Sequence, residues 1–374
     1  MKSGWTEKPF DDVVISRGSG KSALAKSDWI NFGQFPVIGQ GAEAIEGWTD
    51  RDDLVLRTDQ PVVLYGGHTR RAKIVQIPFV PGPNVRILWP KAGLDAHFLF
   101  YFLKFFEVES KGYADHFPLV RKCSVPIPPL KDQQRIVAVL DEAFLGIATA
   151  TANTQKNLTN ARALFESTLA EIFDKKAVAW SQVSLSEAGK TLTGNTPKTG
   201  DKGNFGNFLP FIKPGNFLPN GSIKYDGDGL SEKGAQSSRI IPAGSALMVC
   251  IGATIGKSGY TERNVTSNQQ INAVIPKNGV LGKFLYYQFL TPSFQRSVLD
   301  GSGQATLPII SKSKWSSLAV RLPSTEKEQA DAVKVLDAIS EKSQQLLDLG
   351  RRKLAALSEL KQSLLQKAFA GELT

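Results

Sequence analysis

Two long segments of the chain carry apolar residues at helical spacing. From Lys131 to about Lys175 the sequence has no Pro and a single Gly, Gly146, and its apolar positions are mostly three or four residues apart. The pattern returns from Glu326 to about Phe369, on a stripe that includes Leu346 and Leu360. Stripes with a period close to a heptad are typical of helices that pack on another helix. The sequence therefore predicts two helices, each roughly 65–70 Å long at 1.5 Å per residue.

The rest of the chain has a different pattern, with short β-prone runs bounded by Gly and Pro. In its first part the runs predict strands near 13–15, 62–65, 73–77 and 85–88, and residues 95–106 predict one short helix. Pro126, Pro128 and Pro129 end this part, because a helix cannot run through them. We therefore expect an α+β chain in four parts: a globular domain at 1–128, a helix at 129–176, a second domain at 177–322 and a second helix at 323–374.

The chain contains an internal repeat. KDQQRIVAVLD at 131–141 returns as KEQADAVKVLD at 327–337, a shift of 196 positions. Upstream, Pro36-Val37-Ile38 aligns with Pro210-Phe211-Ile212 at a shift of 174, and Phe10–Val13 aligns with Trp180–Val183 at a shift of 170. The shift grows along the chain without reversing, so we expect two homologous mixed α/β domains with longer loops in the second copy.

The two helices need apolar partners. Helices of this length extend beyond a domain of ~140 residues, whose radius of gyration is roughly 14 Å. The economical arrangement is an antiparallel coiled coil that separates the two domains and gives the chain an internal pseudo-two-fold axis. The alternative, in which each helix lies on its own domain, stays open. A two-helix seam would leave Phe144, Phe173 and Phe369 exposed, so we expect them to contact another protein.

Composition narrows the classes of function. The formal net charge of +10 at pH 7 favours an anionic partner, with nucleic acid among the options. The start, MKSGWTEK, does not resemble a signal peptide, and no apolar run approaches the ~18 residues of a membrane span. Two cysteines are too few for a disulfide framework or a zinc site, and no HExxH spacing occurs. We expect neither a bound metal nor a membrane partner.

Motifs of catalysis are incomplete. RGSGKS at 17–22 has Ile15 where a phosphate-binding loop needs Gly, and GATIGKS at 252–258 is one residue short. The chain contains no Pro-Asp dipeptide of a metal nuclease and no (D/N/S)PP(Y/F) motif of an adenine methylase. A duplicated chain without duplicated reactive residues is expected to bind rather than to catalyse.

The repeated motifs resemble those of a known family. PIPPLKDQQRIVAVLD at 126–141 and KQSLLQKAFAGEL at 361–373 are similar to the helices of specificity (S) subunits of type I restriction–modification systems. FPVIGQG at 35–41 and GATIGKSG at 252–259 resemble the target-recognition domains of these subunits. The resemblance covers essentially the whole chain, in the order recognition domain, helix, recognition domain, helix.

The resemblance implies a function. Each domain would read one half of a split, asymmetric sequence in the major groove of double-stranded DNA. The helices would set the spacing and bind two modification subunits through Phe144, Phe173 and Phe369. The modification subunits would bind S-adenosylmethionine, and further restriction subunits would bind ATP and Mg²⁺. This chain would then need no cofactor of its own. Such a subunit works in bacterial or archaeal cytoplasm.

Candidate DNA contacts are polar and basic residues in Gly-rich loops. Glycine lets backbone approach phosphate, and Arg can read guanine with two hydrogen bonds. A solvated basic surface is the other interpretation of each residue. The candidates are Arg17, Lys21, Lys26, His68, Thr69, Arg70, Arg71 and Lys73 in the first domain and Lys198, Lys202, Lys213, Lys224, Thr254 and Lys257 in the second.

Two other functions stay open. The chain could be a single-chain bifunctional restriction enzyme, although it lacks the motifs of both activities. It could also be a scaffold without DNA, whose helices join two protein-binding modules. Retention on heparin and a salt-dependent shift of duplex DNA separate the scaffold from a DNA-binding protein.

Overall fold

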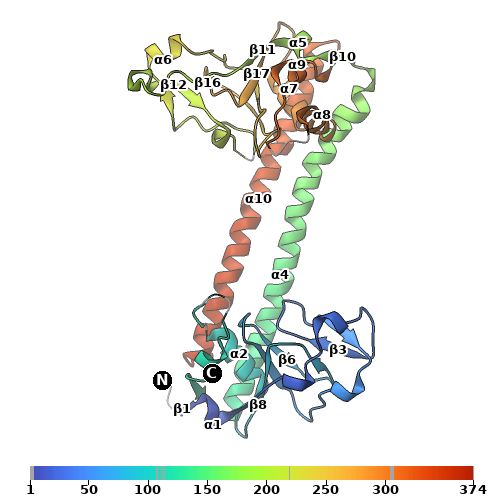
Figure 1. Ribbon diagram of the computed structural model, residues 1–374, viewed down its shortest axis with the longest axis vertical. Coiled ribbons are helices and arrows are strands. Elements are labelled where there is room, and N and C mark those ends of the chain that lie inside the picture. The colour runs from blue at the N-terminus through green and yellow to red at the C-terminus, as the bar shows by residue number, and fades with distance from the viewer. Residues whose placement is uncertain are drawn as a thin grey trace. The chain divides into compact units, whose positions relative to one another are not determined.

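A computed structural model describes residues 4–373, apart from residues 107, 111, 113, 219 and 304–306 (Figure 1). The chain divides into two compact units. Unit 1 comprises residues 1–154 and 352–374, and unit 2 comprises residues 155–351. Each unit therefore combines one globular part with a segment of both long helices.

Unit 1 contains two small sheets and a strand pair. β1 (Thr6–Pro9) pairs with β9 (Ser124–Ile127), next to the short helices α1 (Phe10–Val13) and α3 (Phe117–Val120). A four-stranded antiparallel sheet has the order β2-β8-β5-β6, and a three-stranded sheet has the order β4-β3-β7. Their bounds are β2 Val14–Gly18, β3 Phe35–Ile38, β4 Gly47–Thr49, β5 Val62–Gly66, β6 Ala72–Val75, β7 Val80–Pro81 and β8 Val85–Pro90.

The strands and the short helix expected in the first domain are confirmed within a few residues. The strand expected from Val13 starts at Val14, because Val13 belongs to α1. α2 (Ala96–Phe105) starts where the side chain of Asp95 accepts hydrogen bonds from the backbone N–H groups of His97 and Phe98. Such an N-cap satisfies donors that the first helical turn leaves free.

Unit 2 repeats this topology, so the expectation of two homologous domains is confirmed. Its sheets have the orders β11-β17-β14-β15 and β13-β12-β16, and β10 pairs with β18. Its strands are β10 Ser181–Ser184, β11 Gly189–Thr193, β12 Phe205–Ile212, β13 Gly229–Leu230, β14 Ala246–Val249, β15 Ser258–Tyr260, β16 Thr266–Ser267, β17 Ile271–Pro276 and β18 Ala319–Leu322. Its short helices are α5 Leu185–Ala188, α6 Glu232–Gln236, α7 Gly282–Phe289, α8 Pro292–Ser302 and α9 Lys312–Ser316.

Strand pairing corrects one anchor of the repeat. Thr6 pairs with Ile127, and Ser181 pairs with Leu322, so the first strands correspond at a shift of 175. The alignment of Phe10–Val13 with Trp180–Val183 is therefore wrong, and Trp180 corresponds to Trp5. The parallel pairs of β3 with β7 and of β12 with β16 confirm the shift of 174 for residues 36–38. The shift therefore falls from 175 to 174 before it grows. The sequence alignment matched Trp180, which precedes β10, to Phe10, which follows β1.

The two long helices are confirmed. α4 spans Leu130–Ala170 and continues through one π-helical turn at Glu171–Lys175 and a 3-10 turn at Lys176–Ala179. α10 spans Glu326–Phe369. One 18-residue window of the Leu130–Ala179 helix has a mean hydropathy of 1.4, so by length and composition this helix could cross a membrane, which corrects the sequence expectation. Its first turns nevertheless lie in the core of unit 1, where Ile136 and Leu140 are fully buried.

The helix segments within unit 2 pack antiparallel, as expected, but through a different seam. The Ser343 hydroxyl donates to the Ala161 carbonyl over 3.0 Å. A Cβ atom on Gly350 would lie 2.5 Å from Leu158 Cδ2, so this glycine lets the two helices approach closely. Leu346 and Leu360, expected on the apolar stripe, are exposed. Small and polar residues take their place in the seam, and periodicity alone does not identify such residues.

Each long helix starts on its own globular part through a repeated contact. Gln133, which is fully buried, accepts from Asp95 N over 2.8 Å and donates to the carbonyls of Gly93 and Pro128, each over 2.8 Å. In unit 2, Gln329 accepts from Leu281 N over 2.9 Å and donates to Gly279 O over 2.8 Å. Both glutamines occupy the same position of the repeat.

A second repeated pair lies two turns further along each helix. The Tyr101 hydroxyl donates to Asp141, and the Tyr287 hydroxyl donates to Asp337, both over 2.5 Å. Burial and the hydrogen bond to Asp141 raise the pKa of Tyr101, and burial and the bond to Asp337 raise that of Tyr287. The phenols therefore stay protonated as donors across the physiological range.

The phenylalanines near the ends of the long helices pack on the globular parts, contrary to the expectation of exposure. Phe369 packs on Phe98 with ring centroids 5.2 Å apart, and Phe173 packs on Phe284 at 5.3 Å. Phe173 is buried in the core of unit 2, and Phe369 is half-buried against the core of unit 1. Phe144 is half-buried, with its ring 5.4 Å from that of Tyr101. Neither Phe173 nor Phe369 is exposed, because each one packs against the core of a domain rather than facing outward from the seam.

Candidate nucleic-acid interface

The β5–β6 hairpin positions the basic loop of unit 1. Gly66 N donates to Arg71 O over 2.9 Å, and Arg70 N donates to Gly66 O over 2.8 Å. Arg70 has a φ of 59°, in the left-handed region that non-glycine residues rarely adopt. In unit 2, Val249 N donates to Lys257 O in the same way, and Gly256 has a φ of 86°. Arg70 therefore corresponds to Gly256, and Arg71 corresponds to Lys257.

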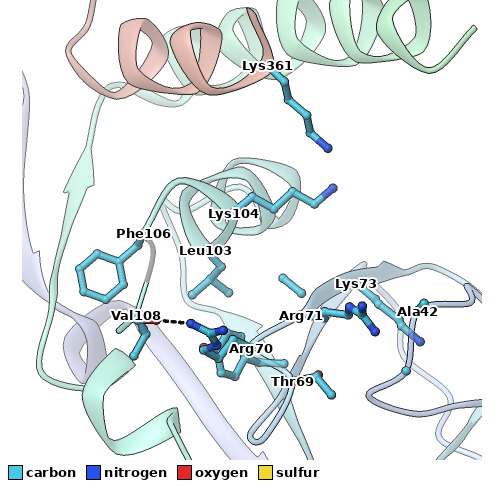
Figure 2. A pocket seen from close by; sticks show the side chains of 13 residues that line it. Ala42, Thr69, Arg70, Arg71, Lys73, Leu103, Lys104, Phe106, Val108 and Lys361 are labelled. Atoms are coloured by element: carbon cyan, nitrogen blue, oxygen red, sulfur yellow. Dashed lines mark hydrogen bonds between the residues drawn. The ribbon is translucent and has the colours of Figure 1, made fainter. Parts of the chain in front are cut away.

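Two of the three cations in this loop have internal partners. Arg70 donates through Nη1 to Val108 O over 2.6 Å (Figure 2). Lys73 Nζ lies 2.6 Å from Glu46 Oε1, and these side chains are only 13% and 16% exposed. Glu46 also accepts from Gly41 N over 2.7 Å. Lys73 thus fixes the preceding loop, whereas Arg71 is exposed.

A hollow of about 670 Å³ opens beside the hairpin. Five cations line it, and none of the other described residues in its lining is a carboxylate. α2 contributes Lys104 and α10 contributes Lys361, and Figure 2 shows the Lys361 side chain extending from its helix toward the end of the Lys104 side chain. The cations are Arg70, Arg71, Lys73, Lys104 and Lys361; the other lining residues are Gly41, Ala42, Tyr65, Thr69, Ala72, Leu103, Phe106 and Val108.

Lys104 is electrostatically unfavourable at this position. Burial and, to a smaller extent, the neighbouring Lys361 lower its pKa from 10.5 to about 8, while Asp141 acts in the opposite direction. Its ammonium lies 4.0 Å from the ring centroid of Phe100, and that of Lys361 lies 5.3 Å from the centroid of Phe144. The cation–π contact of Lys104 offsets part of the cost of desolvating its ammonium group.

We expect Lys104→Leu to stabilise unit 1 at pH 7 by on the order of 1–2 kcal/mol. Between pH 8 and 10.5 the folded parent binds fewer protons at Lys104 than the unfolded chain does, so the parent's stability rises with pH in this window. The advantage of the variant should therefore be largest below pH 8 and shrink toward pH 10.5. Urea unfolding at several pH values measures it, with exposed Lys353→Leu as the control. An advantage that does not depend on pH would contradict the lowered pKa.

The remaining candidates of unit 1 lie on several elements. Arg17 is exposed on β2, its guanidinium 5.7 Å from the Trp89 ring centroid. Thr69 donates to the Gln40 carbonyl over 2.7 Å and lines the cationic hollow. His68 lines a second hollow of about 380 Å³, together with Gly18 and Gly20. Lys21 and Lys26 are exposed in 3-10 turns at Gly20–Ser22 and Lys26–Asp28.

The candidates of unit 2 are more dispersed. Lys257 lines a hollow of about 530 Å³, and Thr254 is exposed nearby in the chain. Lys213 lies 2.5 Å from Asp228 Oδ2, and Lys224 lies 3.5 Å from Asp226 Oδ2, so carboxylates offset both charges. Lys198 and Lys202 are exposed, and neither lines the hollow of Lys257.

Sequence reasoning missed Lys104 and Lys361. Both lie on helices outside the Gly-rich loops in which candidates were sought. Aligned at the shifts of 186 and 196, Lys104 corresponds to Leu290 and Lys361 corresponds to Phe165. A charge in one copy at a position that is apolar in the other is the signal that could have identified them.

Reactive centres of other kinds are not found in the described part of the chain. Cys123 and Cys250 are buried, and burial raises the pKa of each thiol to about 12. No group of three or more His, Cys, Asp or Glu side chains there is arranged to hold a metal ion.

Comparison with known proteins identifies relatives. The family model of the type I restriction modification DNA specificity domain matches residues 2–160 and 177–350. The HindI specificity subunit of Haemophilus influenzae is 35% identical over 151 residues, which cover 39% of this chain and 32% of that protein. The MjaIX specificity subunit of Methanocaldococcus jannaschii is 32% identical over 155 residues, covering 40% and 35%. The matched segment thus spans about a third of the length of these two relatives.

Longer matches extend the likeness at lower identity. The EcoR124I/EcoR124II specificity subunit of Escherichia coli is 24% identical over 356 residues, covering 88% of this chain and 85% of that one. The HsdS subunit of Thermoanaerobacter tengcongensis superimposes with a TM-score of 0.53 at 17% identity, covering 99% and 97%. A chain from a solved type I restriction–modification system superimposes with a TM-score of 0.69 at 17% identity, covering 98% of both. The structural matches support the fold. Because the family model matches both globular domains and most of the sequence, the chain belongs to the family of type I restriction modification DNA specificity domains.

Proposed function

We propose that this chain is the sequence-specific DNA-binding subunit of a type I restriction–modification enzyme. Each unit reads one half of a bipartite, asymmetric site in double-stranded DNA. The observation that carries this proposal is the family match to both globular parts, each with the same strand order and the same glutamine contact to a long helix. Two homologous binding domains in one chain suit a DNA site with two halves.

Catalysis belongs, in this proposal, to partner subunits. Two modification subunits supply methylation with S-adenosylmethionine, and restriction subunits supply cleavage with ATP and Mg²⁺, in the cytoplasm of a bacterium or archaeon. The proposal is supported by the incomplete catalytic motifs of the chain and by its net charge of +10. That charge suits a protein that releases counterions from DNA phosphates.

Exposed apolar residues on the long helices suit the docking of two like partners. In unit 1, Val139 of α4 and Leu360 of α10 are exposed. In unit 2, the residues at the repeated positions, Val335 of α10 and Leu164 of α4, are also exposed. With Phe173 buried, these four exposed side chains take its place as expected contacts of the modification subunits. Phe144 and Phe369, both half-buried in unit 1, remain candidates.

Mapping of methylated adenines tests the function. The chain is combined with its modification subunits and S-adenosylmethionine, and methylated positions in duplex DNA are sequenced. We expect one bipartite motif, no methylation when either component is omitted, and a salt-dependent shift of duplex by the chain. Methylation by the chain alone would identify a bifunctional enzyme. If methylation of the same motif persists without the chain, and the chain does not shift duplex DNA, the chain is a scaffold.

A further inference from the structure

The hollows beside the two hairpins occupy equivalent places in the two units and differ in charge. In unit 2, the corresponding hollow is lined by Leu290 and Phe165, at the repeat positions of Lys104 and Lys361. Its cations, Arg162, Lys257 and Arg351, share the lining with the carboxylate of Glu166. The fold therefore needs no cation at the positions of Lys104 and Lys361, because the other copy is built with apolar side chains there.

The charges of the unit 1 hollow are only partly compensated. Glu46 neutralises Lys73, whereas the carbonyl that accepts from Arg70 cancels no charge. Among the described residues, no ion pair involves Arg71, Lys104 or Lys361. Two of these three cations are neighbours that repel each other, and Lys104 is also half-buried. A partly desolvated cation beside a like charge, where the fold requires neither, is typical of a site for an anion.

We propose that the hollow of unit 1 binds a phosphate group between Lys104 and Lys361, with Arg71 as a third contact. A phosphate oxygen accepts charge-assisted hydrogen bonds from both ammonium groups and relieves their repulsion. The backbone of the bound duplex is one source of this group, which rests on the proposed function, and a free pyrophosphate is the other. Unit 2 carries Leu290 and Phe165 instead, so this anchor is confined to the half-site that unit 1 reads.

The first arm of the test measures duplex binding by the full-length chain with its modification subunits. Lys104→Gln/Lys361→Gln removes the two cations and keeps long side chains. Lys353→Gln/Lys367→Gln, two exposed α10 lysines that do not line the hollow, removes the same charge as the matched control. We expect the hollow variant to bind at least about tenfold more weakly and to lose about 0.9 of the log–log salt slope, the contribution of one phosphate. The control should stay within about twofold.

The second arm measures pyrophosphate binding on the free parent chain and uses a variant only to assign one signal. Lysines are ¹³C-dimethylated, the Lys104 signal is assigned by its loss in Lys104→Gln, and pyrophosphate is titrated. If pyrophosphate shifts that signal and the hollow variant keeps the parent's salt slope of duplex binding, a free phosphate is the source. If the salt slope of the hollow variant changes and pyrophosphate does not shift the signal, the DNA backbone is the source.

The two arms also separate this proposal from the proposed function. A parent chain that binds no duplex, yet whose Lys104 signal moves with pyrophosphate, would refute DNA binding and retain the phosphate site. Equal slopes for the hollow and control variants, together with an unmoved Lys104 signal, would overturn the phosphate site and leave the proposed function standing.

Discussion

Gln133→Ala is expected to lower the free energy of unfolding of unit 1 by about 3–5 kcal/mol. Its amide group satisfies three backbone groups, Asp95 N and the carbonyls of Gly93 and Pro128, and the side chain is fully buried. Truncation leaves these groups without their partner, and each buried unsatisfied group costs about 1–3 kcal/mol. The neighbouring Gln134 is exposed, so Gln134→Ala should change stability by less than about 0.5 kcal/mol.

Hydrogen exchange distinguishes a local effect from a global one. We expect faster exchange in α2 and in the first turns of α4 for Gln133→Ala, with unit 2 unchanged. Gln329→Ala should produce the same loss around α7, because Gln329 contacts Leu281 and Gly279 in the same way. Equal, small effects of Gln133→Ala and Gln134→Ala would show that the helix start is held by apolar packing alone.

The fold could be predicted from the sequence where the signal is long and periodic. Helices of 41 and 44 residues leave many apolar positions at the same spacing, so α4 and α10 were located within a few residues. The duplicated motif then implied two homologous domains, because one sequence repeated in one chain adopts one fold. The seam was assigned less well, since Ser343 and Gly350 carry no hydrophobic signal. They are recognised only when the facing residues, Ala161 and Leu158, are placed in space.

The candidate site was predicted less completely than the fold. A basic residue in a Gly-rich loop has the same sequence pattern whether its charge is free or paired. Lys73 is held by Glu46, which lies 27 residues earlier, and Lys213 is held by Asp228. Lys104 and Lys361 come from helices that the sequence places far apart and that meet only in the folded unit. Such contacts depend on tertiary structure, which a linear pattern does not contain.

A paired four-residue insertion is expected to change the spacing of the recognised sequence. α4 and α10 are the continuous helices that the two units share, and four residues lengthen a helix by about 6 Å. DNA rises 3.4 Å per base pair along each strand, so this corresponds to roughly two base pairs. Four residues make about one turn, so the packed faces keep nearly the same orientation. We expect the half-site sequences to persist and the gap between them to widen by one or two base pairs.

The contacts of the seam determine where the residues should be inserted. An insertion near Leu347 would separate Ser343 from Gly350, which pack on Ala161 and Leu158 within unit 2. Insertion between residues 154 and 155 and between residues 351 and 352, at the boundary of the units, leaves these contacts intact.

An unpaired insertion in α4 provides the matched control for the paired one. It lengthens one helix against the other, so the antiparallel register is lost and methylation should fall strongly. Methylated positions are mapped for both variants in complex with the modification subunits. An active paired variant with an unchanged gap would show that the helices do not set the spacing. New half-site sequences would show instead that the helices take part in reading the bases, since the insertion leaves every residue of both globular parts in place.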